Sequence, residues 1–484
     1  MLFNSPTFLF YYLPVVLFIY LVLGKRFQNL FLLFSSLIFY LWGETILFPI
    51  IFFSIGINFY VGKRISNETS DPNKVKRFLI TALTFNVALL VFFKFFSAYI
   101  LDLSESLNLS ISDSLLKDAK KFNLLPLGIS FYTFTSISYL LDIYKKRSDC
   151  ETKLSNFALY ILLFPKVVAG PIVRYREIAL QFTQRVITTQ NLAIGARRFI
   201  VGLSKKVLIA DTLAPVTTKV FALPITDLTT RLAWLGILCY TIQIYFDFSG
   251  YTDMAIGLGQ MLGFKFVENF NYPYISKSIS DFWQRWHISL SRWFRDYAFF
   301  PLERKRAGIS HYSQQMNILI VFLLTGLWHG VTPCFILWGL LHGLAISLEV
   351  SKFGKWLKTT WTPFQHFYAM TIIIIGWVLF RSENLVYAYG YLKSMLGFST
   401  GTRIIPFSAL PIVETHTWLA LIIGGLLSFP IFPALDRVLF KAQQSQKVVA
   451  GIGVIRDVLL IGLFIVSITG IASSTFQAYI YLRF

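Results

Sequence analysis

Apolar segments recur along almost the whole chain, and they restrict its possible folds more than any other feature. They lie at 7–23, 30–42, 45–61, 78–100, 124–144, 157–173, 231–246, 316–329, 334–350, 367–380, 415–433 and 454–472. Hydrophobic residues make up 55% of the chain and charged residues 14%. Lipid offers no hydrogen-bond partners to a backbone, so such segments cross a bilayer as helices. The sequence therefore predicts an all-α, polytopic multi-helix membrane bundle.

Several of these segments are shorter than the ~20 residues that a membrane span requires. We therefore expect about 10–13 membrane segments, with further interfacial and re-entrant helices. The sequence contains neither a repeat of 20–50 residues nor a separate soluble domain, which predicts one integral-membrane domain over residues 1–484.

The net charge of +20 is carried by basic clusters between the apolar segments. In a membrane protein such clusters mark cytoplasmic loops. The basic residues at 25–26, 63–77 and 145–147 then lie inside, and the mixed-charge segment 101–121 lies outside. This alternation predicts an extracytoplasmic N-terminus for a multi-pass membrane protein. Nucleic-acid binding is disfavoured because no basic domain stands apart from the membrane segments.

Two segments combine aromatic or apolar residues with arginine and lysine. Residues 191–211 resemble a basic amphipathic helix that lies on the cytoplasmic membrane surface. Residues 279–297 predict one helix with an aromatic face, an opposite polar face that includes Arg295 and Asp296, and His287 at the boundary. This second helix is either an interfacial anchor or the wall of an internal cavity.

His329 ends an apolar run, directly before Gly330 and Pro333. A proline interrupts a helix, and inside a membrane an interrupted helix is tolerated where it is buried in protein or lines a wet cavity. His342 lies within the following apolar run. Ionisable residues at membrane depth are usually functional, but a neutral histidine can also be a structural hydrogen-bonding group. Both interpretations stay open on spacing alone.

The chemistry open to these histidines is limited by the motifs that the sequence lacks. It contains no P-loop, no G-x-S-x-G, no HExxH and no paired cysteine motif, and no cluster of residues predicts a metal site. The simplest interpretation is a general base that takes a proton from an alcohol as the alcohol attacks an activated acyl group. A proton-coupled transporter with no covalent chemistry is the competing class.

Longer motifs carry a family resemblance. They include PLGISFYTFTSISYLLDIYKK at 126–146, FPKVVAGPIVRY at 164–175, YFDFSGYTDMAIGLGQMLGF at 245–264, NFNYPYISKSISDFWQRWHISLSRWFRDYAFFPL at 269–302 and LLTGLWHG at 323–330. The chain resembles the membrane-bound O-acyltransferase (MBOAT) family, most of all its bacterial alginate O-acetylation branch. The most family-like core covers residues 126–345.

The resemblance implies a helix bundle with a central tunnel in which donor and acceptor meet. It implies catalytic roles for His329 and His287. Candidate substrate-contacting residues are Asp296, Arg295, Trp328 and His342. It further implies acetyl-CoA as donor with no bound cofactor, and an extracytoplasmic partner acetyltransferase that delivers the acetyl group to a polysaccharide.

Two related activities fit the same resemblance. One is D-alanyl transfer to teichoic acid from a carrier protein, and the other is peptidoglycan O-acetylation. The sequence does not name the acceptor.

Overall fold

The computed structural model describes residues 1–44, 46–68, 71–96, 125–306, 312–398, 414–431, 433–434 and 446–473. Every regular element within these ranges is helical, which confirms the all-α prediction. The predicted outer loop at 101–121 lies outside the described residues. The described chain forms two compact units, one of Met1–Gly195 with Ala255–Val267, the other of Ala196–Met254 with the described residues from Glu268 onward. A single integral-membrane domain stays a prediction.

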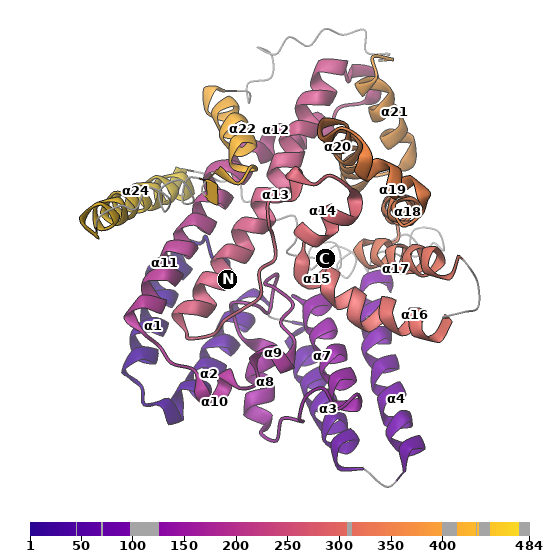
Figure 1. The fold of residues 1–484 in the computed structure, drawn as a ribbon. Coiled ribbons are helices and arrows are strands. Elements are labelled where there is room, and N and C mark those ends of the chain that lie inside the picture. Colours follow the sequence, from indigo (N-terminus) through magenta and orange to yellow (C-terminus); the bar gives the residue numbers. More distant parts are fainter. Residues whose placement is uncertain are drawn as a thin grey trace, which may run out of the picture. The chain divides into compact units, whose positions relative to one another are not determined.

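The first unit contains most of the helices of the N-terminal half. They are η1 (Phe8–Tyr12), α1 (Leu13–Val22), α2 (Lys25–Gly43), α3 (Phe48–Asn67), α4 (Pro72–Val91), η2 (Phe92–Phe96), α7 (Ile129–Tyr144), α8 (Leu154–Leu162), α9 (Tyr175–Ile178) and α10 (Gln181–Gln184). Helices α3, α4 and α7 pack side by side (Figure 1). Asn58 of α3 and Asn86 of α4 are buried and exchange side-chain hydrogen bonds of 3.2 and 2.7 Å. This polar pair fixes how the two apolar helices meet.

The apolar segment at 157–173 departs from the prediction. Helix α8 ends at Leu162, and residues 163–173 continue as a buried, non-helical chain. Pro165 and Pro171 lie in this stretch, and each lacks the backbone N–H that a helix would need. An apolar composition was therefore a poor guide to helix here.

The second unit contains the remaining elements. They are η3 (Lys205–Ala210), α12 (Asp211–Phe221), η4 (Ile225–Asp227), η5 (Pro273–Ile275), α14 (Ile279–Arg285), α15 (Ile288–Phe294), η6 (Arg295–Phe299), α16 (Phe300–Arg306), α17 (Ser313–His329), α18 (Pro333–Glu349), α19 (Lys352–Thr359), α20 (Thr362–Arg381), α21 (Leu385–Met395), α22 (Thr415–Leu427) and α24 (Gln446–Ser473). Helices α11 (Thr189–Ser204) and α13 (Thr230–Met261) contribute residues to both units.

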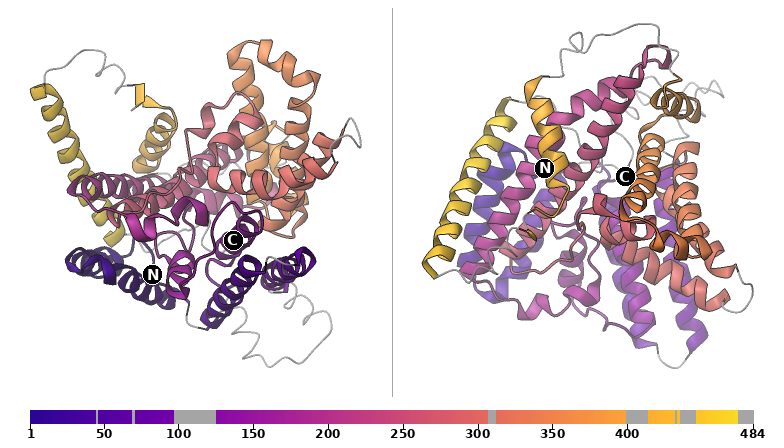
Figure 2. Two further views of the ribbon diagram at one scale, coloured as in Figure 1. Left: turned by 60° about the horizontal axis from the view of Figure 1, so that its bottom comes forward. Right: turned by 45° about the horizontal axis from the view of Figure 1, so that its top comes forward.

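A close helix hairpin forms one part of the second unit. Helices α17, α18 and α20 lie side by side in Figures 1 and 2. Gly326 of α17 and Gly339 of α18 bring the first two backbones together. A Cβ atom at Gly339 would lie 2.4 Å from the carbonyl oxygen of Phe322, and one at Gly326 would lie 2.5 Å from that of Phe335. Small residues at the crossing allow this close approach, as is common between membrane helices.

The predicted surface helix at 191–211 is wrong in its extent and in the placement of its charges. The helical chain runs on through η3 and α12, and the side chain of Lys206 is 0% exposed. The Lys206 ammonium lies 2.7 Å from Asp211 and 2.6 Å from Asp247. Lys205 forms an ion pair with Asp253. Lys206 therefore forms a buried ion-pair cluster with carboxylates of α12 and α13, whereas Lys205, with 25% of its side chain exposed, pairs with Asp253 of α13.

Four helical segments of the described chain are long and apolar enough to cross a membrane: Pro72–Phe95, Thr230–Met261, Thr362–Arg381 and Gly451–Ser473. The pair Pro333–Glu349 and Lys352–Thr359 passes the same test together, with a bend of 77° between its helices. The chain is thus a multi-pass membrane protein. A total of about 10–13 membrane segments stays a prediction.

Candidate active site

The predicted helix break beside His329 is confirmed. Helix α17 ends at His329, and Pro333 begins α18 in the first-turn position where proline is tolerated. A Cβ atom at Gly330 would lie 2.6 Å from the ring of Phe335, so the backbone can pass that ring here because the residue is glycine. The turn places His329 at the carboxyl end of its helix, where only 8% of the residue is exposed.

Aromatic rings surround the His329 imidazole. Its ring centroid lies 4.5 Å from that of Trp328, 5.0 Å from that of Trp338 on α18 and 4.9 Å from that of Phe380 on α20. His329 and Trp328 are thus brought together as adjacent members of one aromatic site.

His342 lies one helix away and contacts the other side of Trp338, with ring centroids 5.0 Å apart. The Trp283 indole N–H donates a 3.4 Å hydrogen bond to His342 Nδ1. A Cβ atom at Gly376 of α20 would lie 2.8 Å from His342 Nε2, so glycine makes room for this edge of the ring. An indole nitrogen can only donate, and His342 is therefore the neutral tautomer protonated at Nε2. The contacts enclose His342 on both nitrogen-bearing edges.

The single helix predicted at 279–297 is wrong, because the chain breaks at His287. Helix α14 ends at Arg285 and α15 begins at Ile288, with His287 between them at φ 42° and ψ 53°. A side chain in this left-handed region is uncommon and strained. The predicted position of His287 on the boundary of a continuous helix is consequently also wrong.

The break is held by Asn269. Its backbone carbonyl accepts from the N–H of Ile288 at 2.9 Å, and its Oδ1 accepts from the N–H of Ser289 at 3.1 Å. Nδ1 of His287 lies 3.1 Å from the same Oδ1. These bonds replace the helical acceptors that α15 loses at the break. His287 is 1% exposed, its ring meets Phe248 edge-on, and it lies outside the candidate spans. Burial lowers the pKa of His287 to about 3.

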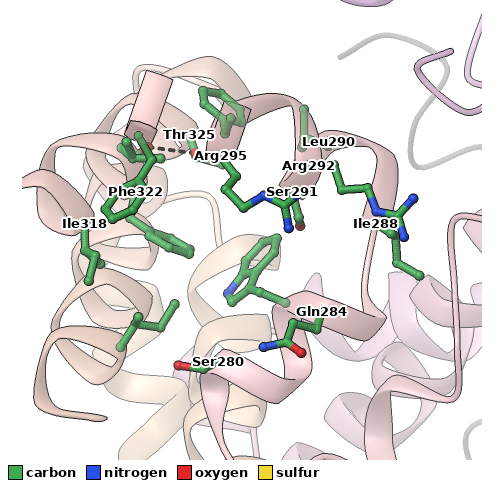
Figure 3. A pocket seen from close by; sticks show the side chains of 15 residues that line it. Ser280, Gln284, Ile288, Leu290, Ser291, Arg292, Arg295, Ile318, Phe322 and Thr325 are labelled. Carbon is green, nitrogen blue, oxygen red and sulfur yellow. Dashed lines mark hydrogen bonds between the residues drawn. The ribbon is translucent and has the colours of Figure 1, made fainter. Parts of the chain in front are cut away.

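Arg295 and Asp296 are adjacent and form an ion pair of 3.0 Å. The Arg295 side chain remains 54% exposed and extends into a pocket of about 560 Å³ (Figure 3). Ser280 and Gln284 of α14 and Thr325 of α17 add polar groups to walls that are otherwise mainly apolar. His329, His287 and His342 do not line this pocket. The buried histidines are therefore not part of the pocket wall around Arg295, although Trp283 both lines this pocket and donates to His342.

The part of the chain that the structure describes contains no group of three or more His, Cys, Asp or Glu side chains arranged to hold a metal ion. The buried histidines instead contact aromatic rings, an indole donor and an amide. Such a site suits proton transfer and acyl chemistry. A central tunnel stays a prediction, as do the catalytic and substrate-binding roles assigned to these residues.

Sequence reasoning missed Asn269, Trp283 and Trp338. Asn269 is 18 residues from His287 and lies in an irregular stretch of chain before η5 and α14, where no periodicity marks it. Trp283 was placed on an aromatic face, but nothing in its spacing indicated a hydrogen bond to a histidine of another helix. The block 269–302 was the available signal, since it contains both Asn269 and Trp283.

Comparison with known proteins gives one family. Residues 145–388 match the model of the membrane-bound O-acyltransferase family, MBOAT. The chain is 41% identical to the probable alginate O-acetylase AlgI of Pseudomonas aeruginosa, over 83% of this chain and 76% of the relative. It is 35% identical to the peptidoglycan O-acetyltransferase of Helicobacter pylori, over 82% and 80%. It is 34% identical to the teichoic acid D-alanyltransferase of Bacillus subtilis, over 51% and 65%.

Proposed function

The chain belongs to the membrane-bound O-acyltransferase family, and from this premise we propose that it supplies acetyl groups for O-acetylation of an extracytoplasmic, alginate-like polysaccharide. Membership makes it an O-acyltransferase. The observation that carries the choice of acetyl transfer to a polysaccharide is the 41% identity to an alginate O-acetylase over 83% of the chain.

In the proposed reaction His329 is the general base. Its neutral imidazole takes the proton of an acceptor hydroxyl while that oxygen attacks the carbonyl carbon of an acetyl thioester. The new C–O bond forms, the C–S bond breaks, and the thiolate leaves with the proton that His329 returns. The helix break and the surrounding aromatic rings support this role, because they hold the imidazole at the end of its helix in a buried, aromatic setting.

We propose acetyl-CoA as the donor, with Arg295 binding its phosphates. Arginine binds phosphate oxygens through paired N–H groups, and the Arg295 side chain extends from η6 into a pocket with apolar walls. That combination suits a ligand with an anionic end and a long, weakly polar arm. Asp296 would hold the guanidinium in place through its 3.0 Å ion pair.

The proposed setting is a bacterial inner membrane with the N-terminus on the extracytoplasmic side. Acetyl-CoA is a cytoplasmic donor and the polysaccharide lies outside, so the acetyl group has to cross the membrane. We expect a partner acetyltransferase to complete delivery to the glycan. This topology is tested by labelling single cysteines near residue 5 and residue 148 from each side of sealed vesicles.

A second candidate is D-alanyl transfer to teichoic acid from a carrier protein. Its support is the similarity of 51% of the chain to a teichoic acid D-alanyltransferase. The peptidoglycan variant differs from the leading proposal only in its acceptor and has support over 82% of the chain.

The donor test uses the purified protein in lipid nanodiscs. Release of free thiol is followed with acetyl-CoA, with S-acetylpantetheine, and with a D-alanyl-loaded carrier protein. We expect turnover with acetyl-CoA and a higher KM for it in Arg295→Gln, with the KM for S-acetylpantetheine unchanged because that donor lacks the phosphates. Lys277→Gln, at an exposed position outside the pocket, is the matched control. Turnover with the D-alanyl-loaded carrier protein, and none with acetyl-CoA, would favour the second candidate.

A further inference from the structure

The surroundings of His287 determine which of its ring nitrogens carries a proton. The Ser289 backbone N–H lies 3.1 Å from one terminal atom of the Asn269 side chain. A backbone N–H can only donate, so that atom is the carbonyl oxygen Oδ1 and not the amide nitrogen. The Ser289 backbone N–H, which can only donate, therefore determines the orientation of the Asn269 amide.

The same oxygen faces His287. Nδ1 lies 3.1 Å from it, and Oδ1 is solely an acceptor, so Nδ1 has to be the donor. In a neutral imidazole the other nitrogen, Nε2, then carries the lone pair. The Ser289 hydroxyl adds a third bond to Oδ1 at 2.9 Å, which holds the amide in this orientation.

His287 Nε2 is buried and has no hydrogen-bond partner among the described residues. Asn269 and His287 are each 1% exposed, so the arrangement is shielded from bulk water. A buried acceptor without a partner is costly, and such groups in native proteins usually have a functional reason. Burial alone accounts for the lowered pKa of His287, with no charged group among the described residues contributing to it.

We propose that Asn269 is a positioning residue, which holds His287 in the Nδ1–H tautomer and thereby leaves Nε2 as an acceptor for a substrate O–H or N–H group. This assignment rests on the proposed function, because a substrate is needed to use Nε2. His287 then either orients the substrate group or receives its proton. It does not stabilise an oxyanion through Nε2, since that task requires an N–H donor.

The first test of this proposal does not depend on activity. Protein labelled with ¹⁵N-histidine is placed in nanodiscs, and the His287 signals are identified among the six histidines by their loss in His287→Gln. We expect a protonated Nδ1 and an unprotonated Nε2 in the wild type. In Asn269→Leu, which removes the acceptor, the His287 tautomer is expected to change. A wild-type Nε2–H signal, or an unchanged tautomer in Asn269→Leu, would overturn the proposal.

The second test measures acetyl transfer with the same variants. Groups that orient metal-bound imidazoles typically contribute about 10- to 100-fold, and we expect a loss of activity of the same order in Asn269→Leu. Asn269→Asp keeps the acceptor and should restore the Nδ1–H tautomer and part of the activity. Its carboxylate would raise the pKa of His287 relative to the wild type, so the acid limb of the pH–rate profile should move to higher pH.

Asn271→Leu is the matched control, because Asn271 is exposed and two residues away. If Asn269→Leu does not fold, the pH–rate profile of Asn269→Asp still tests the proposal. A pH profile of Asn269→Asp that matches the wild type would contradict the positioning role. If the wild type shows no acetyl transfer but the tautomer changes as expected, the proposed function fails and the assignment of Asn269 stands.

Discussion

His329 and His342 contact the same indole, that of Trp338, but they differ in their positions within the helices and in their other contacts. His342 lies inside α18, receives a hydrogen bond from Trp283 and presses against Gly376. His329 lies at the end of α17, where the backbone leaves the helix and turns toward Pro333. Both residues are buried, with 1% of His342 and 8% of His329 exposed. What distinguishes a candidate catalytic histidine here is therefore its place at a helix break.

The largest effect expected from this comparison is that of His329→Ala on turnover. Loss of a general base typically costs 10²- to 10⁴-fold, so we expect kcat to fall by about that factor with KM for acetyl-CoA little changed. The exposed His416→Ala is the matched control and should retain wild-type kcat. A folded His329→Ala variant with normal kcat would remove the distinction between the two histidines.

A smaller effect is expected from Gly376→Ala, which acts on the His342 side. The added methyl group would lie 2.8 Å from His342 Nε2 and 3.5 Å from Trp338 Cδ1, so the ring has to shift. Overpacking of this kind costs about 1–3 kcal/mol of stability. Thermal unfolding in detergent measures it, with Gly462→Ala as control because nothing lies within 4 Å of that position. Equal unfolding midpoints for the two variants would show that His342 is not tightly enclosed.

The smallest effect is expected from His342→Gln. The amide can still accept from Trp283, so the cost is that of a less well-placed hydrogen bond, at most about 0.5–1.5 kcal/mol of stability. We expect a slightly lower unfolding midpoint and near wild-type kcat. A loss of kcat as large as that of His329→Ala would assign His342 to the chemistry as well, and would break the comparison.

Local sequence signals were sufficient for part of the site. Gly330 and Pro333 predicted the helix break beside His329, because proline and glycine act on the backbone of their immediate neighbours. The apolar segments predicted an all-helical membrane protein, because a helix satisfies its backbone hydrogen bonds within one segment and needs no distant partner in lipid. The long motifs of the region 126–345 indicated the family before any geometry was known.

Features that depend on distant residues could not be predicted in this way. The break at His287 requires the carbonyl and the side chain of Asn269 from an irregular loop. The burial of Lys206 requires Asp247, which comes from α13 and completes an internal ion pair. Helical periodicity describes one helix face and says nothing about the partner that reaches it.

The most direct test of the account is product formation on a glycan. Nanodisc-embedded wild type and His329→Ala are incubated with acetyl-CoA, the partner acetyltransferase and alginate oligosaccharides, and the oligosaccharides are analysed by mass spectrometry. The account predicts O-acetyl groups on the oligosaccharides with the wild type and none above background with His329→Ala. Equal acetylation by both folded proteins would contradict the central role given to His329.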